Sequence, residues 1–206
     1  MACAIDDGNG SAPDAGALLR WNYARLWRRL GLRVLLGLSL CALPVVLVRV
    51  GVPDSVLLAA PTAAGVLVLV LTAFRMPQAF VWMRACRRIL RVYPLEARSG
   101  VVCKERTSGK WGTLFELRVP YAQAGRSRRM KAVDCAEGNS WPEGNDGSVF
   151  VAGDLDFGGV LLVPQGRVLM LLQPMKPELI PQEAATASST RRALAEQARF
   201  RTRALK

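Results

Sequence analysis

The sequence contains no histidine among its 206 residues. This absence excludes Ser-His-Asp triads, Cys-His dyads and every metal site that needs an imidazole ligand. Phosphate-binding loops of the GxxxxGKS or GxxxxGKT type are missing as well. We therefore expect a protein that is not an enzyme, with no catalytic residues, no bound metal and no cofactor.

Cysteine is present, but in no pairing pattern. The five cysteines are scattered, no CxxC spacing occurs, and an odd number does not make a disulfide framework. Cys41 lies inside an apolar stretch, where a free thiol behaves as a small apolar group. Cys103 and Cys135 could meet across a sheet, but because no activating motif accompanies them we favour core or edge positions over a redox pair.

The whole chain carries 28 basic and 16 acidic residues. Few of the acidic residues lie beside the apolar stretches. Residues 75–91 hold five Arg and no Asp or Glu, whereas residues 92–175 hold ten basic and nine acidic residues. The positive charge is therefore concentrated next to the apolar stretches and in the tail. This placement favours a lipid bilayer with anionic headgroups as the partner and argues against nucleic acid.

Two stretches have no charged residue at all: 34–48, with fifteen residues, and 55–74, with twenty. Twenty residues at 1.5 Å each span about 30 Å, the thickness of the hydrocarbon core of a bilayer. We predict transmembrane helices over 34–52 and 55–75 that form a hairpin, with Arg49 reaching out of the membrane. Pro44 is expected to kink the first helix. A buried helical hairpin of a soluble protein would show a polar face, and neither stretch has one.

The flanks of the hairpin are basic and amphipathic. Residues 17–33 predict a juxtamembrane helix in the headgroup layer, and residues 77–91 predict either a second such helix or an extension of the second span. Five Arg precede the first span and five follow the second, with only Arg49 between them. Basic flanks stay inside, so we expect a multi-pass cell-membrane protein with both termini cytoplasmic. The residues predicted at the membrane interface are Arg20, Trp21, Arg25, Trp27, Arg28, Arg29, Arg33, Arg49, Arg75, Trp82, Arg84, Arg87, Arg88 and Arg91.

The remainder of the chain has a different pattern. Residues 1–16 are small and polar, and we expect them to be disordered. Residues 92–175 alternate between short strand-like segments and turns, with strands expected at 96–104, 112–119, 129–133, 148–152, 159–163 and 167–173. This pattern predicts a small cytoplasmic antiparallel all-β barrel or sandwich domain after the two-helix membrane hairpin. Residues 176–206 form a basic tail that is either disordered or helical.

Two features of the β-domain carry candidate binding residues. Asp154 and Asp156 would share one side of an extended chain, where they could hold a divalent cation. The simpler interpretation of this pair is a solvated loop. The second feature is a basic run beside a predicted turn: Arg126, Arg128, Arg129 and Lys131. This run is suited to phosphate, nucleic acid or anionic lipid, or else it is simply solvated.

The hairpin and the segment SVFVAGDLDFGGVLLVP, residues 148–164, resemble uncharacterised two-span integral membrane proteins of GC-rich actinobacteria. The resemblance covers most of residues 20–175. It implies a basic amphipathic start, a helical hairpin and a small cytoplasmic β-domain, in that order. It implies no activity.

We therefore expect a membrane-anchored β-domain that acts as an interaction or scaffolding module at the inner membrane face. Its protein partner is not identified by the sequence, and nothing in the sequence selects a homo-oligomer over a monomer. The alternative is a sensor or binding module for anionic lipid or nucleic acid, acting through the basic flanks and residues 126–131.

Overall fold

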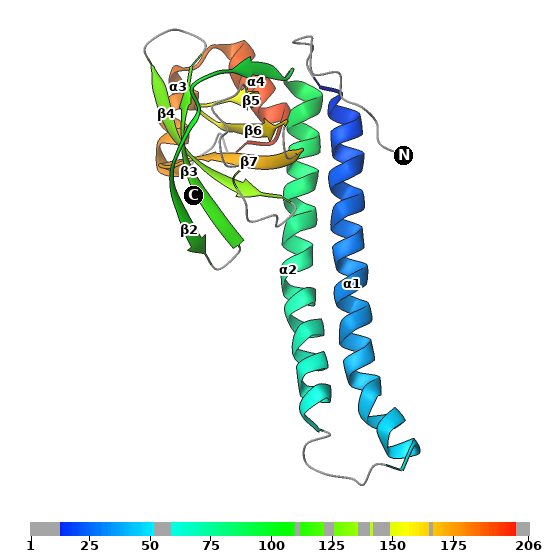
Figure 1. Cartoon of the computed structure of the whole chain (residues 1–206). Coiled ribbons are helices and arrows are strands. Elements are labelled where there is room, and N and C mark those ends of the chain that lie inside the picture. Colours follow the sequence, from blue (N-terminus) through cyan, green and yellow to red (C-terminus); the bar gives the residue numbers. More distant parts are fainter. Residues whose placement is uncertain are drawn as a thin grey trace.

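The computed structural model describes residues 13–51, 59–109, 112–121, 126–135, 141, 149–164 and 167–200. Two long helices lie side by side, and a curled antiparallel sheet packs against one end of the pair (Figure 1). The expected disorder of residues 1–12 lies outside the described residues, and so do position 52 of the first predicted span and positions 55–58 of the second.

Helix α1 (Ala15–Arg49) is one continuous helix of 35 residues. Its first turn is capped by Asp14, whose carboxylate accepts a hydrogen bond from the Gly16 amide at 2.8 Å. Residues 17–33 and 34–49, predicted as a juxtamembrane helix and most of a membrane span, therefore form one helix, because no capping residue or proline interrupts it between them. Figure 1 shows the C-terminal turns of α1 bending, and Pro44 lies in this part of the helix.

Helix α2 (Ala59–Val92) is also continuous, with 34 residues, and it contains Pro77. Of the two structures expected for residues 77–91, the extension of the second apolar helix is the one found. At 1.5 Å per residue, each helix is roughly 50 Å long. Both helices are therefore much longer than the hydrocarbon core of a bilayer, which is about 30 Å thick.

The two helices approach closely where glycines face each other. A Cβ atom built on Gly65 would lie 2.7 Å from the carbonyl oxygen of Gly37, which is closer than real Cβ atoms come to a backbone atom. The thiol of Cys41 lies next to the same contact and points at the carbonyl oxygen of Thr62, 3.9 Å away. Small side chains thus permit the close backbone packing that is common between membrane helices.

Seven strands form one antiparallel sheet in the order β1-β5-β6-β7-β4-β3-β2. The sheet is curled into a half-barrel (Figure 1), which confirms the antiparallel all-β prediction as one sheet rather than two packed sheets. The strands are β1 (Glu96–Arg98), β2 (Val102–Gly109), β3 (Gly112–Pro120), β4 (Ser127–Asp134), β5 (Val149–Asp154), β6 (Gly158–Val163) and β7 (Val168–Pro174).

The first expected strand, residues 96–104, is two strands in the structure. Gly100 adopts a φ of 74° between them, and this left-handed conformation ends β1 before β2 begins. As a result β1 pairs with β5 at one edge of the sheet, while β2 pairs with β3 at the other. Strand β2 also continues to Gly109, through residues that were expected to form a turn.

Strands β6 and β7 are buried on both faces, which explains their nearly unbroken apolar sequences. Leu161 and Met170 point into the core inside the half-barrel, together with Phe115 and Leu117 of β3. Their neighbours along the strands point outward and pack on the helices. This outer contact joins Val160, Leu162, Leu169 and Leu171 of the sheet to Leu18 and Leu26 of α1 and to Met76, Ala79, Met83, Cys86 and Ile89 of α2.

The tail is helical up to residue 197 and packs on the domain. It contains a 3-10 turn, η2 (Pro177–Leu179), and the helices α3 (Ile180–Thr186) and α4 (Ser189–Gln197). The Ser188 hydroxyl caps α4 by accepting a hydrogen bond from the Arg191 amide at 3.3 Å. Ile180, Ala184 and Ala195 bury Phe157 of the β5–β6 turn, so the helices cover that end of the sheet.

We predict that Gly65→Ala lowers the thermal midpoint of the purified protein by about 2–10 °C, because the added methyl group forces the helix backbones apart. Circular dichroism in detergent measures the change. Gly31→Ala is the matched control, since nothing lies within 4 Å of the Cβ that it would add. The control should raise the midpoint slightly, because alanine favours the helix by about 0.5–1 kcal/mol. A rise of equal size in the thermal midpoint of both variants would contradict the close approach of the two helix backbones at Gly65.

Candidate functional site

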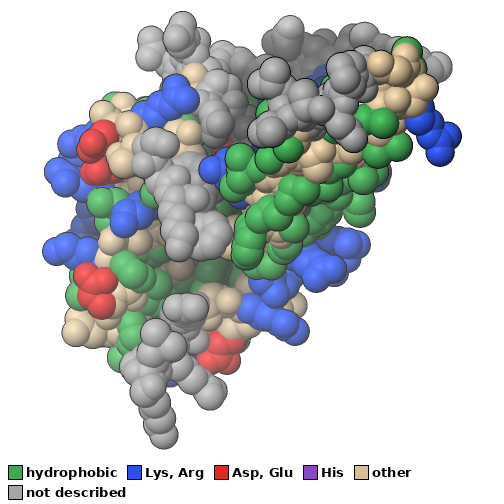
Figure 2. All heavy atoms as spheres, turned by 90° about the horizontal axis from the view of Figure 1, so that it is seen from below, with side chains coloured by type: hydrophobic (Ala, Val, Ile, Leu, Met, Phe, Trp, Pro, Cys, Tyr) green, Lys and Arg blue, Asp and Glu red, His purple; other side chains and the backbone are tan. Residues whose placement is uncertain are grey.

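The end of the hairpin away from the sheet is apolar and uncovered. The most apolar windows of α1 and α2 have only 6% and 22% of their residues buried, whereas the core helix of a soluble protein is mostly buried. Both helices are long and apolar enough to cross a membrane. Figure 2 views this end and shows a continuous apolar surface over the helices. Its large exposed side chains include Leu35, Leu36, Val45, Val46, Val66, Leu67, Val70 and Phe74.

The arginines predicted at the membrane interface are spread along the helices and do not lie in one layer. Arg33 of α1 and Arg75 of α2 border the uncovered apolar half, and Arg49 lies at its far end. Arg20 precedes Arg33 by 13 residues, a rise of about 20 Å along a straight helix. Arg25, Arg28, Arg29, Arg84, Arg87, Arg88 and Arg91 also lie along the part of the hairpin that extends away from this border.

The predicted interface tryptophans have different surroundings. The guanidinium groups of Arg25 and Arg167 lie 5.4 and 6.0 Å from the ring centre of Trp21, so Trp21 contacts the β6–β7 turn. Trp27 is 58% exposed and packs edge-on against Phe80, with ring centres 5.1 Å apart. Trp82 packs against the buried contact between the helices and the sheet.

The helices are also tied to the sheet by a buried polar group. Asn22 of α1 is fully buried, and its side-chain amide donates hydrogen bonds to the carbonyls of Leu18, at 2.9 Å, and Arg167, at 3.1 Å. The second bond reaches the β6–β7 turn. The end of the hairpin near the chain's start is therefore fixed to the sheet by a hydrogen bond as well as by apolar packing.

The basic run of residues 126–131 does not form one patch, because strand alternation divides it. Arg128 points to the part-buried side of β4, while Arg129 and Lys131 point to the exposed side. Arg129 lies 3.8 Å from Glu116, and its side chain is 64% exposed. Arg126 is exposed just before the strand, and its carbonyl accepts a hydrogen bond from the Tyr121 amide.

Asp154 and Asp156 belong to a group of five charged side chains that we call the ion-pair cluster: Arg128, Asp154, Asp156, Glu183 and Arg191. Arg191 donates to Asp154 and Asp156 at 2.7 Å each. Arg128 pairs with Asp156 and forms a two-pronged contact with Glu183, at 2.7 and 2.8 Å. The cluster therefore joins β4 and the β5–β6 turn to α3 and α4.

One prediction from the sequence was a divalent cation held between Asp154 and Asp156. In the structure, guanidinium groups occupy that place. Arg191 engages both carboxylates and Arg128 engages Asp156, so guanidinium groups take up the oxygens that a cation would need. Within the described ranges, no group of three or more His, Cys, Asp or Glu side chains could hold a metal ion. The arrangement is suited to fastening the C-terminal helices to the sheet.

The charge of Asp156 is stabilised by its partners. Burial alone would raise the pKa of Asp156, but hydrogen bonds from Tyr121 and Arg191, with the positive charges of Arg128 and Arg191, hold it below the ordinary value of 3.8. The carboxylate is therefore ionised throughout the neutral range. Its free-energy contribution to folding is present above pH 3.8 and is lost as the pH falls through the lower pKa of the folded state.

A polar groove of about 640 Å³ lies beside the ion-pair cluster, and Tyr93, Arg98, Tyr121 and Arg126 help to line it. Burial raises the pKa of Tyr93 to about 12, and the charge of Asp154 acts in the same direction. The Tyr93 hydroxyl is therefore protonated at neutral pH. Because groups of both signs line the groove, it has no clear preference for an anion or a cation.

Two members of the ion-pair cluster, Glu183 and Arg191, were not predicted from the sequence, and neither were Tyr93, Arg98 and Tyr121 of the groove. Glu183 and Arg191 lie in the tail, where the sequence left helix and disorder open. The i to i+8 spacing between them indicates no contact in itself, since they lie on two separate helices. Only the packing of α3 and α4 on the sheet brings them to Arg128 and the two aspartates.

We predict that Asp156→Asn lowers the free energy of unfolding by about 1–3 kcal/mol at pH 7, because it removes a charge that pairs with the part-buried Arg128 and with the exposed Arg191. The difference from the wild type should shrink as the pH falls below 3.8, since the wild-type carboxylate then becomes protonated. Chemical denaturation at several pH values measures both effects.

Glu178→Gln is the control for this experiment. Glu178 is exposed on η2 and has no ion pair among the described residues, so its loss should change stability by less than about 0.5 kcal/mol. Equal losses in the two variants, or a difference for Asp156→Asn that does not shrink as the pH falls below 3.8, would contradict a stabilising role of the ion-pair cluster.

The chain was compared with protein-family models, with curated proteins and with solved structures. No family model, no curated protein and no solved structure matches it. The resemblance to two-span membrane proteins of actinobacteria therefore stays a prediction.

Proposed function

We propose that this protein is a membrane-anchored interaction module, with the hairpin inserted in a bilayer and the sheet held beside the inner membrane face. One observation supports the proposal above all: the two helices are covered by the sheet at one end and uncovered at the other. One end packs on β6 and β7, while the other end leaves its large apolar side chains exposed. An apolar surface of this extent is stable in lipid and is a liability in water.

The dimensions of the uncovered half support insertion. From Ala59 to Arg75, α2 rises about 24 Å, most of the thickness of a hydrocarbon core. Arg33 and Arg75 then lie at the headgroups on the side of the sheet, where arginine finds phosphate partners. Because the basic residues gather on that side, the sheet and both termini belong in the cytoplasm.

The free edge of the sheet is the surface that supports an interaction role. Strand β2 is an edge strand, and Lys104, Glu105 and Arg106 are exposed along it. An edge strand has unpaired backbone amides and carbonyls, which can accept an added strand from a partner. The other edge strand, β1, has three residues against eight in β2, so β2 is the longer place for an added strand.

We expect a reporter fused after Lys206 to be active in the cytoplasm and one fused after Gly51 to be active only outside, since Gly51 follows α1 at the far end of the hairpin. Alkaline phosphatase and a fluorescent protein distinguish the two sides. The unfused protein should also stay in the membrane fraction after carbonate washing. An external signal from the Lys206 fusion would overturn the orientation, and release by carbonate would overturn the insertion.

The interaction role predicts a discrete cross-linked product from β2. A photoreactive amino acid placed at Lys104 or Arg106 should capture a partner in intact cells, whereas the same group at Arg20 is the control, since Arg20 lies on α1 and is exposed. Lys104→Pro, which disturbs the backbone of the edge, should reduce capture from position 106. Equal products from position 20, or none from β2, would contradict the use of this edge.

A further inference from the structure

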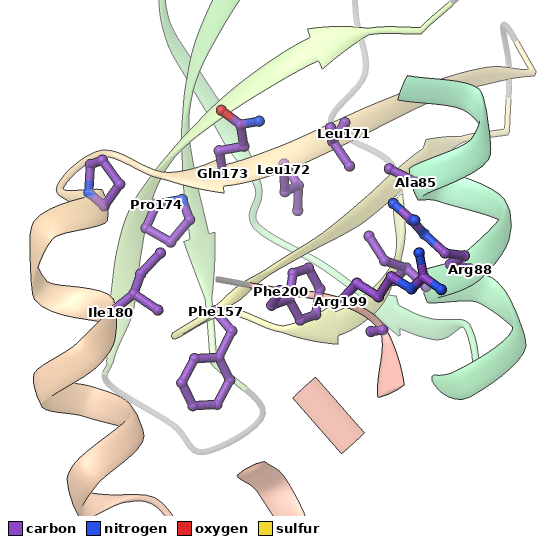
Figure 3. A pocket seen from close by; sticks show the side chains of 13 residues that line it. Ala85, Arg88, Phe157, Leu171, Leu172, Gln173, Pro174, Ile180, Arg199 and Phe200 are labelled. Carbon is purple, nitrogen blue, oxygen red and sulfur yellow. The ribbon is translucent and has the colours of Figure 1, made fainter. Parts of the chain in front are cut away.

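A second cavity, of about 440 Å³, lies between α2, β7 and the C-terminal segment (Figure 3). We call it the tail pocket. Its lining is mostly apolar and includes Ile89, Phe157, Leu172, Ile180 and Phe200. The volume falls within the range of small-molecule sites, and the mixture of many apolar side chains with few polar ones is typical of them.

Two arginines, Arg88 and Arg199, complete the lining, and Figure 3 shows both side chains toward the same end of the pocket. Neither forms an ion pair with any acidic side chain that the structure describes. The Nε atom of Arg88 is buried and has no hydrogen-bond partner. A buried donor without a partner is costly, and two like charges at one end of a cavity favour an anion between them.

The backbone at Arg199 is a second feature of this end of the pocket. Arg199 follows α4 with a φ of 59°, and the Phe200 amide donates back to the Ala195 carbonyl at 2.9 Å. This is the left-handed helix end that glycine normally occupies, because other residues are strained there. Strain that persists at a ligand-sized cavity indicates a function for the side chain.

We propose that the tail pocket binds an amphiphile with one anionic head group, a carboxylate or a phosphate monoester, and a single apolar chain. Arg88 and Arg199 would pair with the head group, and the chain would lie toward Phe157 and Ile180. This inference goes beyond the interaction role proposed above. The recognition chemistry does not depend on that role.

The position of the pocket favours a single chain over a diacyl lipid. Arg88 lies 13 residues beyond Arg75 on α2, a rise of about 20 Å from the proposed headgroup layer. A ligand must therefore leave the bilayer completely to reach the pocket, which a monoacyl amphiphile does far more readily than a phospholipid. This step alone rests on the proposed membrane insertion.

The test uses the full chain in phosphatidylcholine nanodiscs and a diazirine derivative of decanoate as the probe. After irradiation, label should be found in peptides that contain Phe157 and Ile180. Decanoate and decyl phosphate should compete with the probe, and the stronger of the two identifies the head group. Decanol, which has the chain without the charge, should need at least tenfold higher concentrations, and butyrate, which has the charge with a short chain, should not compete.

Variants separate recognition from folding. Arg88→Gln and Arg199→Gln should each weaken competition by decanoate about ten- to a hundredfold, the usual effect of losing a charge-assisted hydrogen bond. Arg87→Gln is the matched control, because Arg87 is exposed on the same turn of α2 and does not line the pocket. Arg199→Gly should bind as weakly as Arg199→Gln while its thermal midpoint equals or exceeds that of the wild type, since glycine relieves the strain.

Three results would overturn the proposal. Decanol competing as well as decanoate would mean that the cavity does not recognise an anion. Label confined to the apolar half of the hairpin would mean that the probe only partitions into the lipid. An equal loss of binding in Arg87→Gln would mean that binding depends only on the overall positive charge of the protein. None of these results affects the topology experiment, so failure here is distinguishable from failure of the membrane anchor.

Discussion

The apolar contact between α2 and the outer face of β6 and β7 determines the position of every other part of the molecule. Met76, Ala79, Met83, Cys86 and Ile89 recur every three or four residues and form one buried stripe. Burying a large apolar side chain contributes about 1.5–3 kcal/mol, so this stripe is a major source of stability. It fixes the height of the sheet along the helices and leaves the other half of the hairpin uncovered.

Local patterns in the sequence predicted much of this architecture. Residues 34–48 of the first uncharged stretch and the described residues 59–74 of the second lie within the long helices, and the alternation in residues 112–119 became strand β3. Boundaries between elements were predicted less well. The helix begins two residues before the predicted start at residue 17, and the predicted juxtamembrane helix continues into the first apolar stretch, because a change from charged to apolar residues alters the surroundings of a helix without ending it.

The ion-pair cluster could not be predicted, because its members come from four separate elements. Arg128 looked like part of one basic run with Arg129, and only the pairing of β4 in the sheet turns the two side chains to opposite sides. Asp154 and Asp156 were recognised as a pair from their spacing. Their partners were not, since Arg191 lies 35 residues after Asp156 and reaches it through the packing of α4.

The continuity of the two helices has a mechanical consequence. With the hairpin in a bilayer as proposed, the outer parts of α1 and α2 and the sheet fixed to them move as one lever arm. Membrane helices tilt to match bilayer thickness, by roughly 20° on average. Such a tilt displaces a point 20 Å above the headgroups sideways by roughly 7 Å. A thinner or thicker membrane therefore shifts the domain along the surface without any change in its internal structure.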